Sequence, residues 1–176
     1  MKPDLNLDAN DFVLFGLPER YALDRADLDA RWRQLQSSAH PDRFAAQGPQ
    51  AQRLAMQWSV RINKAYGRLR EPLARAAYLC ELRGVPIDAH HNTAMPGEFL
   101  HQQIGWREAL DDARSDAALA ALDREVRSAE NERTARLAVL LDEQCAPDEA
   151  AQQVRALMFI RRFRADLGER IDALQP

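Results

Sequence analysis

The sequence predicts an all-α protein in two parts, an N-terminal antiparallel helix hairpin and a C-terminal three-helix bundle. The composition predicts helix, because only 7 of 176 residues are glycine and helix formers such as Ala, Leu, Arg, Glu and Gln dominate. Long stretches repeat apolar residues every three or four positions. The one clear break lies near residues 84–97, where two glycines and two prolines gather. We therefore expect domains at 1–84 and 98–176, joined by a linker at 85–97.

The composition also limits the classes of function. Apolar residues make up 46% and charged residues 29% of the chain, which is typical of a folded, soluble protein. The formal net charge of −3 argues against a nucleic-acid partner. No apolar run approaches the length of a membrane span, and the acidic N-terminus resembles no targeting peptide. We expect a cytoplasmic protein with no membrane partner.

Neither a metal site nor an enzyme motif is predicted. Cys80 and Cys145 lie far apart with no CxxC pair, so we expect both to be small core residues in a reducing compartment. His90 and His91 are adjacent and cannot both face one ion from a regular element. No P-loop, GxSxG or GxGxxG sequence occurs. The sequence therefore predicts no cofactor and no catalytic residue.

The first part begins with a short apolar segment, residues 11–18, in which Asp11 is expected to cap one helical turn that buries Phe12 and Phe15. Two long helices should follow and pack antiparallel, over about 24–39 and from Pro49 to Arg70. A shorter helix is expected after Pro72, closed by Gly84. The predicted stripes of the long helices are Leu28, Trp32 and Leu35, then Leu54, Trp58, Ile62, Ala65 and Leu69.

The tripeptide His40-Pro41-Asp42 lies between these two long helices. Pro41 keeps His40 out of the α region and fixes its own φ, so the first helix must end there in a stiff turn. Such a turn could be incidental, or it could present the imidazole and the carboxylate to a partner. Cations surround it, and they suit either a solvated helix face or docking on an acidic surface. These cations are Arg31, Arg33 and Arg43 near the turn, and Arg61, Lys64 and Arg68 on the facing helix.

Three helical patterns fill the second part, from Gly97 to about residue 114, from after Ser115 to about 144, and from Pro147 to the C-terminus. Short connections imply antiparallel neighbours in a bundle. The expected core residues are Phe99, Trp106, Leu110 and Ala113, then Leu119, Leu122, Val126, Leu137 and Leu140, then Leu157, Ile160, Leu167 and Ile171.

A second row on the first bundle helix points away from this core. Leu100, Ile104, Glu108 and Asp112 follow each other at intervals of four, with an apolar half and an acidic half. On the last helix, Phe159 lies roughly opposite the core stripe. A wide core could absorb all five side chains, or they could form an apolar patch rimmed by acids on which a protein docks.

The helix, the His-Pro-Asp turn and the second helix together resemble a J-domain. Two further segments are more specific: Phe12-Val-Leu-Phe-Gly-Leu-Pro18, and Asn63-Lys-Ala-Tyr-Gly-Arg-Leu-Arg-Glu-Pro-Leu-Ala-Arg-Ala-Ala-Tyr-Leu79. With Glu98-Phe-Leu and Trp106-Arg-Glu-Ala-Leu-Asp-Asp112, they resemble the HscB family of J-type co-chaperones of iron–sulfur cluster biogenesis over nearly the whole chain. No N-terminal CxxC pairs are present, which indicates the bacterial type.

The resemblance implies two partners. The DnaK-type chaperone ATPase HscA would be stimulated through His40, Pro41 and Asp42, with Arg31, Arg33 and Arg43 beside them. The bundle would hold the scaffold protein IscU, on which clusters are assembled. The resemblance maps this scaffold-binding face to Leu100, Ile104, Glu108, Asp112 and Phe159.

Two positions depart from the family pattern on this face. His101 stands where a methionine is common, and Gly105 stands where an acid is common, so the face should be less apolar and less acidic. Two other functions remain open. The chain could be a general J-protein that serves an ordinary DnaK and other clients, or a protein that binds a metal or a cluster through His and Cys.

Overall fold

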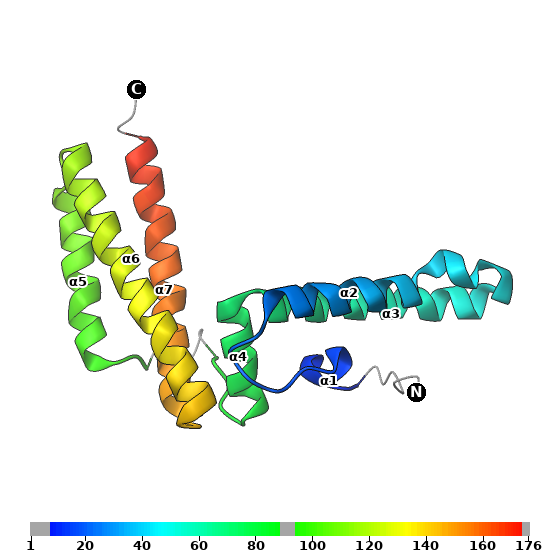
Figure 1. The fold of residues 1–176 in the computed structure, drawn as a ribbon. Helices are drawn as coiled ribbons and strands as arrows, with labels where there is room; N and C mark the ends of the chain where they lie inside the picture. The colour runs from blue at the N-terminus through cyan, green and yellow to red at the C-terminus, as the bar shows by residue number, and fades with distance from the viewer. Residues whose placement is uncertain (1–7, 89–93, 174–176) are drawn as a thin grey trace. The chain divides into compact units, whose positions relative to one another are not determined.

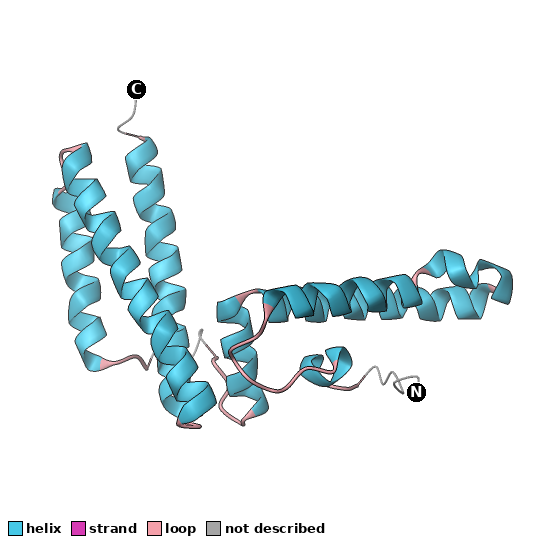
Figure 2. Cartoon of the chain, viewed as in Figure 1, coloured by secondary structure: helices cyan, strands magenta, loops and turns pink. Residues whose placement is uncertain are grey.

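The computed structural model describes residues 8–88 and 94–173, and every regular element among them is a helix (Figures 1 and 2). The chain divides into two compact units, Met1–Tyr78 and Leu79–Pro176. The division falls inside the helix α4, Pro72–Leu82, rather than in the predicted linker. Residues 89–93 of that linker lie outside the described residues, and the predicted domain limits stay a prediction.

The first unit is a helix hairpin with a short helix beside it (Figure 1). Each helix begins where the chain supplies a cap or a proline: Asp24 accepts from the amide of Ala26 at 2.8 Å, and a proline opens the helix at Pro49. The elements are α1 Asp11–Phe15, α2 Arg25–Ala39, the 3₁₀ helix η1 Pro41–Gln47, and α3 Pro49–Arg70.

The short helix α1 packs against α3 through a buried ion pair. The side chain of Asp11 is almost fully buried and lies 2.7 Å from Arg61 Nη1 and 3.4 Å from Arg68 Nε. The predicted cap was wrong, because Asn10 caps α1 by accepting from the amide of Val13. Asp11 instead neutralises two cations of α3. Phe12 and Phe15 are buried as predicted.

The apolar core of the hairpin lies far from the turn. Leu28, Ile62 and Leu69 are buried there. The predicted stripe of α3 is wrong at its first residue, because Leu54 is 49% exposed. Leu54 lies near the turn, where α2 and η1 are the described elements that contact α3.

The second unit holds the end of α4 and a bundle of three helices (Figure 1). Its predicted second helix ends in a π-helical segment, and the last carbonyls of a helix have no partner within the helix. One of these, the carbonyl of Leu141, accepts from Arg83 Nη1 at 2.6 Å. The elements are α5 Gly97–Asp112, α6 Asp116–Ala138, the π segment η2 Val139–Glu143, and α7 Pro147–Asp172.

The bundle buries large side chains along its whole length. An aromatic cluster joins α5 to α7, with Trp106 stacked on Phe163 at 5.8 Å between ring centroids and Phe99 edge-on to Trp106. Leu110 and Ile171 are only half-buried, and the other predicted core residues of the bundle are buried. The prediction for the cysteines is half right. Burial raises the pKa of Cys80 to about 11, whereas Cys145 is exposed.

Candidate functional site

The His-Pro-Asp turn stands exposed at the end of the hairpin. His40 follows the last residue of α2 as its C-cap and has an extended backbone, as a residue before proline should. Its side chain is 57% exposed, and that of Asp42 is 87% exposed. His40 Nδ1 accepts from the amide of Asp42 at 3.3 Å, so the neutral ring carries its proton on Nε2. The turn therefore holds its own imidazole in place and leaves both side chains accessible.

The imidazole and the carboxylate of the motif lie close to each other. His40 Nδ1 is 3.5 Å from Asp42 Oδ2. The two groups belong to the residues on either side of Pro41, whose ring fixes the backbone between them. The motif thus presents one donor and one acid in a geometry that the backbone determines.

The three arginines predicted beside the turn are not equivalent. Arg31 pairs with Asp27 and donates to the carbonyls of Phe15 and Gly16, so it fastens the loop after α1 to α2. Arg43 donates to the carbonyl of Ser37 at 3.1 Å and thereby caps the C-terminus of α2. Arg33 is exposed, and its charge lowers the pKa of Asp29 after the larger effects of Arg25 and Tyr66.

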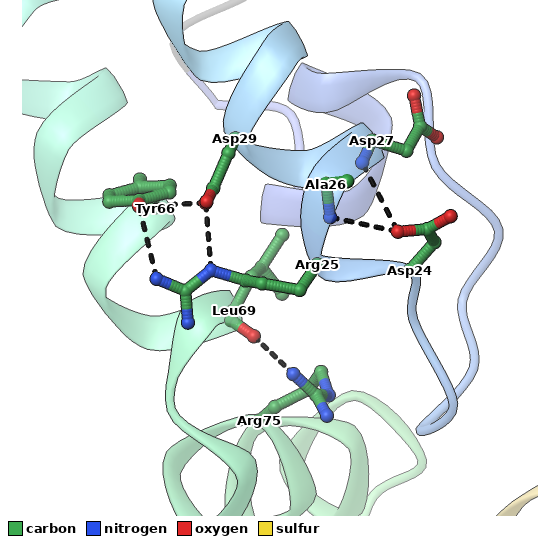
Figure 3. A network of polar contacts seen from close by, with 8 residues as sticks. All are labelled: Asp24, Arg25, Ala26, Asp27, Asp29, Tyr66, Leu69 and Arg75. Carbon is green, nitrogen blue, oxygen red and sulfur yellow. Dashed lines mark hydrogen bonds and ion pairs between the residues drawn. The ribbon is translucent and has the colours of Figure 1, made fainter.

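Polar contacts join α2 to α3 along one side of the hairpin. At its base, Asp29 accepts from Arg25 and from the hydroxyl of Tyr66, both at 2.8 Å (Figure 3). These two hydrogen bonds lower the pKa of Asp29. The ring of Tyr66 stacks on Trp32 with 4.6 Å between centroids. These contacts hold α2 and α3 together at the base of the hairpin.

The predicted row on α5 lies on the surface. Leu100 is 46% and Ile104 is 58% exposed, and both are large aliphatic side chains. Glu108 and Asp112 continue the row and are exposed as well. At 1.5 Å per residue, the row extends about 18 Å along the helix. We call Leu100, Ile104, Glu108 and Asp112 the α5 row.

Phe159 is less free than the helical wheel predicted. Its ring is half-buried and packs edge-on against Phe99 at 5.8 Å and parallel to Phe163 at 6.1 Å. The guanidinium of Arg107 lies over the ring, 5.5 Å from its centroid. Phe159 therefore lies beside α5, with one part in the core and one part at the surface.

The bundle core fixes the orientation of α5. Trp106 donates from its indole nitrogen to Glu125 on α6 at 2.8 Å. Arg133 of α6 lies over the ring of Phe99 at 4.3 Å and donates to Gln102 and Gln153, so it ties all three helices together. Burial lowers the pKa of the Arg133 guanidinium. The α5 row is thus carried by a helix that is held on its opposite side.

The two positions on this face that depart from the family pattern, His101 and Gly105, have little structural consequence. His101 is exposed, and its Nδ1 lies 3.3 Å from the carbonyl of Gly97 in the same helix. A side chain at Gly105 would meet no other group. Both positions are adjacent in sequence to residues of the α5 row. They therefore change the polarity beside the row, and they leave the backbone of α5 unchanged.

Sequence reasoning missed two residues at these surfaces. Arg107, over Phe159, gave no signal because a charged residue on a helix face is usually solvated. Gln36, which contacts α3 near the turn, gave none either.

Within residues 8–88 and 94–173, no group of three or more His, Cys, Asp or Glu could hold a metal ion. His90 and His91, which were predicted not to share one ion, lie outside the described residues. No helix in the described part of the chain has both the length and the apolar character needed to cross a membrane.

Comparison with known proteins finds relatives that all belong to one family. Residues 95–168 match the family model of the HSCB C-terminal oligomerisation domain. The chain is 49% identical to the co-chaperone protein HscB homolog of Burkholderia multivorans, over 97% of this chain and 99% of the relative. It is 51% identical to the homolog of Cupriavidus taiwanensis, over 93% of this chain and 94% of the relative.

Solved structures agree with these relatives. The chaperone HscB from Vibrio cholerae matches with a TM-score of 0.78 and 35% identity, over 94% of this chain and 99% of that one. The human co-chaperone protein HscB matches with a TM-score of 0.84 and 26% identity, over 93% and 83% respectively. The chain therefore belongs to the HscB family, the J-type co-chaperones of iron–sulfur cluster biogenesis.

Proposed function

We propose that this chain is a cytoplasmic, non-enzymatic adaptor that stimulates the ATPase of the DnaK-type chaperone HscA and delivers the scaffold IscU to it. In this proposal, residues 1–84 act as the J-domain and residues 98–176 bind the scaffold, with residues 85–97 between them. Membership in the HscB family supports both halves of the proposal, because this family serves iron–sulfur cluster biogenesis.

The observation that carries the proposal is the exposed His-Pro-Asp turn. His40 and Asp42 are held by a proline and by a backbone hydrogen bond, yet both side chains are accessible. A ligand shifts a partner's equilibrium only by its different affinity for the partner's two states. A stiff turn suits this task, because it contacts one arrangement of the ATPase well and the other poorly. His40, Pro41 and Asp42 would therefore favour the hydrolysis-competent state.

The arginines would contribute in different ways. Arg33 is exposed and can face an acidic surface of the chaperone, where opposite charges accelerate and orient encounter. Arg31 and Arg43 also belong to the proposed chaperone-binding surface, but their guanidinium groups already bind carbonyls of the hairpin. Replacing either of them should therefore disturb the local structure as well as the charge.

The α5 row and Phe159 would bind the scaffold. Leu100 and Ile104 supply apolar surface that is removed from water on binding. Glu108 and Asp112 supply an acidic rim that selects a basic partner surface. Arg107, above Phe159, would have to move or share the contact. The more polar His101 and Gly105 beside the row should reduce the apolar contribution to affinity.

A steady-state ATPase assay tests this proposal. The full chain is titrated into HscA, with and without IscU, and into an ordinary DnaK as a matched chaperone. We expect strong stimulation of HscA, a further increase with IscU, and little effect on DnaK. Equal stimulation of both chaperones without any effect of IscU would instead identify a general J-protein.

A further inference from the structure

The part of the hairpin that carries the turn has almost no apolar core. Among the described residues from 36 to 58, only Ala39 and Ala55 are buried. A hollow of about 310 Å³ lies between the helices here, and Phe44, Leu54 and Trp58 line it without filling it. Close packing therefore contributes little to the stiffness of the turn. Other contacts must hold α2 and α3 together near His40.

One polar cluster makes these contacts. Gln36 of α2 donates from its side-chain nitrogen to Asn63 Oδ1 and to the carbonyl of Ser59, the latter at 3.4 Å. The hydroxyl of Ser59 donates back to Gln36 Oε1 at 3.1 Å. Trp32 donates to the same Asn63 oxygen at 3.0 Å. Both the donor and the acceptor ends of the Gln36 amide are thus bound to α3.

The cluster lies one helical turn before the motif. Gln36 precedes His40 by four residues, which is about 6 Å along α2. After Gln36, Arg43 holds the end of α2 by donating to the carbonyl of Ser37. That contact ties η1 to α2 but not to α3. The 3₁₀ helix η1 packs along α3 by itself. The orientation of His40, at the end of α2, therefore depends in part on how Gln36 fixes the last turn of α2 against α3.

We propose that Gln36 is a positioning residue that orients the His-Pro-Asp turn for the chaperone ATPase; this inference rests on the function proposed above. Without the Gln36 contacts, the turn would spend part of its time in orientations that do not fit the chaperone. The apparent affinity of a ligand falls by the fraction of molecules in the competent state, whereas saturation still reaches the same bound complex. Loss of Gln36 should thus raise the concentration needed and leave the maximal stimulation intact.

The chain offers matched controls for this experiment. Gln34→Ala removes an exposed side chain of the same type from the same helix, outside the cluster. Tyr66→Phe removes an inter-helix hydrogen bond to Asp29 at the base of the hairpin, far along α2 from His40. Ser59→Ala is a milder change than Gln36→Ala, because it removes one contact of the cluster and keeps the others.

The test titrates the full-length variants into HscA and measures the half-maximal concentration and the maximal rate separately. For Gln36→Ala we expect a half-maximal concentration about fivefold higher, with an unchanged maximal rate. Ser59→Ala should give a shift of about twofold, and Gln34→Ala and Tyr66→Phe should give none. An unchanged half-maximal concentration for Gln36→Ala, or an equal shift for Tyr66→Phe, would overturn the proposal.

Amide hydrogen exchange gives a second readout that needs no partner. In Gln36→Ala, the amides of residues 42–47 should exchange faster than in the native chain, and in Tyr66→Phe they should not. If the native chain fails to stimulate HscA, the function proposed above is wrong, and the exchange rates still decide whether Gln36 orders the turn. Unchanged exchange at residues 42–47 in a folded Gln36→Ala chain would overturn the positioning role.

Discussion

Along the bundle, large apolar side chains are buried from one end of the helices to the other, whereas in the hairpin they are buried only at its base. Phe99, Trp106 and Phe163 lie in the bundle core. In the hairpin, Leu28 and Ile62 are buried, but Leu54 near the turn is half exposed. The two surfaces proposed to bind partners follow this difference. The hairpin presents a polar turn, and the bundle presents an aliphatic row on a helix that is firmly packed behind.

The difference predicts two modes of binding. A polar turn offers little area, so its effect on a partner comes from the placement of a few groups. An exposed aliphatic row offers apolar surface that is removed from water on contact, so it mainly raises the affinity for the partner. Substitutions in the turn should therefore change what the partner does, and substitutions in the row should change how tightly the partner binds.

The largest effect is expected at the turn. His40→Gln keeps a polar side chain at an exposed position, so the chain should fold normally. It should nevertheless lose all stimulation of HscA at any concentration, because the imidazole is the group that we expect to contact the ATPase. The check is the ATPase titration, with circular dichroism as the control for folding. Retained stimulation by the folded variant would refute the role of the turn.

Next comes a substitution in the bundle core. Trp106→Ala removes a buried indole, its stacking on Phe163 and its hydrogen bond to Glu125. The free energy of unfolding should fall by about 3–5 kcal/mol, which denaturant titration measures. Leu54→Ala in the hairpin is the matched comparison, and its cost should be below about 1 kcal/mol because half of that side chain is already in water. Similar costs for both variants would remove the contrast between the two units.

The α5 row should give a smaller effect. Leu100→Ala combined with Ile104→Ala removes two exposed side chains, so the core stays intact. We expect scaffold affinity to fall about tenfold in a calorimetric titration, since each side chain contributes modestly. Val60→Ala in the hairpin, where Val60 is 64% exposed, serves as the control and should leave affinity unchanged. Unaltered binding by the double variant would exclude the row from the interface.

Local signals were sufficient to predict the helices and the turn. Pro49 and Pro72 mark the ends of α3, and Pro41 marks the end of α2. Spacing alone left the aliphatic half of the α5 row either in a wide core or in a surface patch, and in the structure it is exposed. These features depend on residues close together in sequence, where backbone geometry and periodicity act directly.

Contacts between distant residues could not be predicted in this way. Asp11 looked like a cap, but it is buried because Arg61 and Arg68, fifty or more residues later, neutralise it. Arg31 looked free, but carbonyls of the loop after α1 bind it. Phe159 looked opposite to the core, but α5 lies beside it. Each of these outcomes depends on which segment packs alongside, and periodicity does not contain that information.

The central claim is that one chain joins the ATPase to the scaffold, and a mixing experiment tests it most directly. The His40→Gln chain keeps the α5 row, and the Leu100→Ala, Ile104→Ala chain keeps the turn. The two are mixed and added to HscA with IscU, and the increase in ATPase rate due to IscU is measured against each variant alone and against HscA with IscU only. We predict that the mixture gives no increase beyond that of the double variant alone. An increase equal to that of the native chain would contradict the claim that both surfaces must act within one molecule.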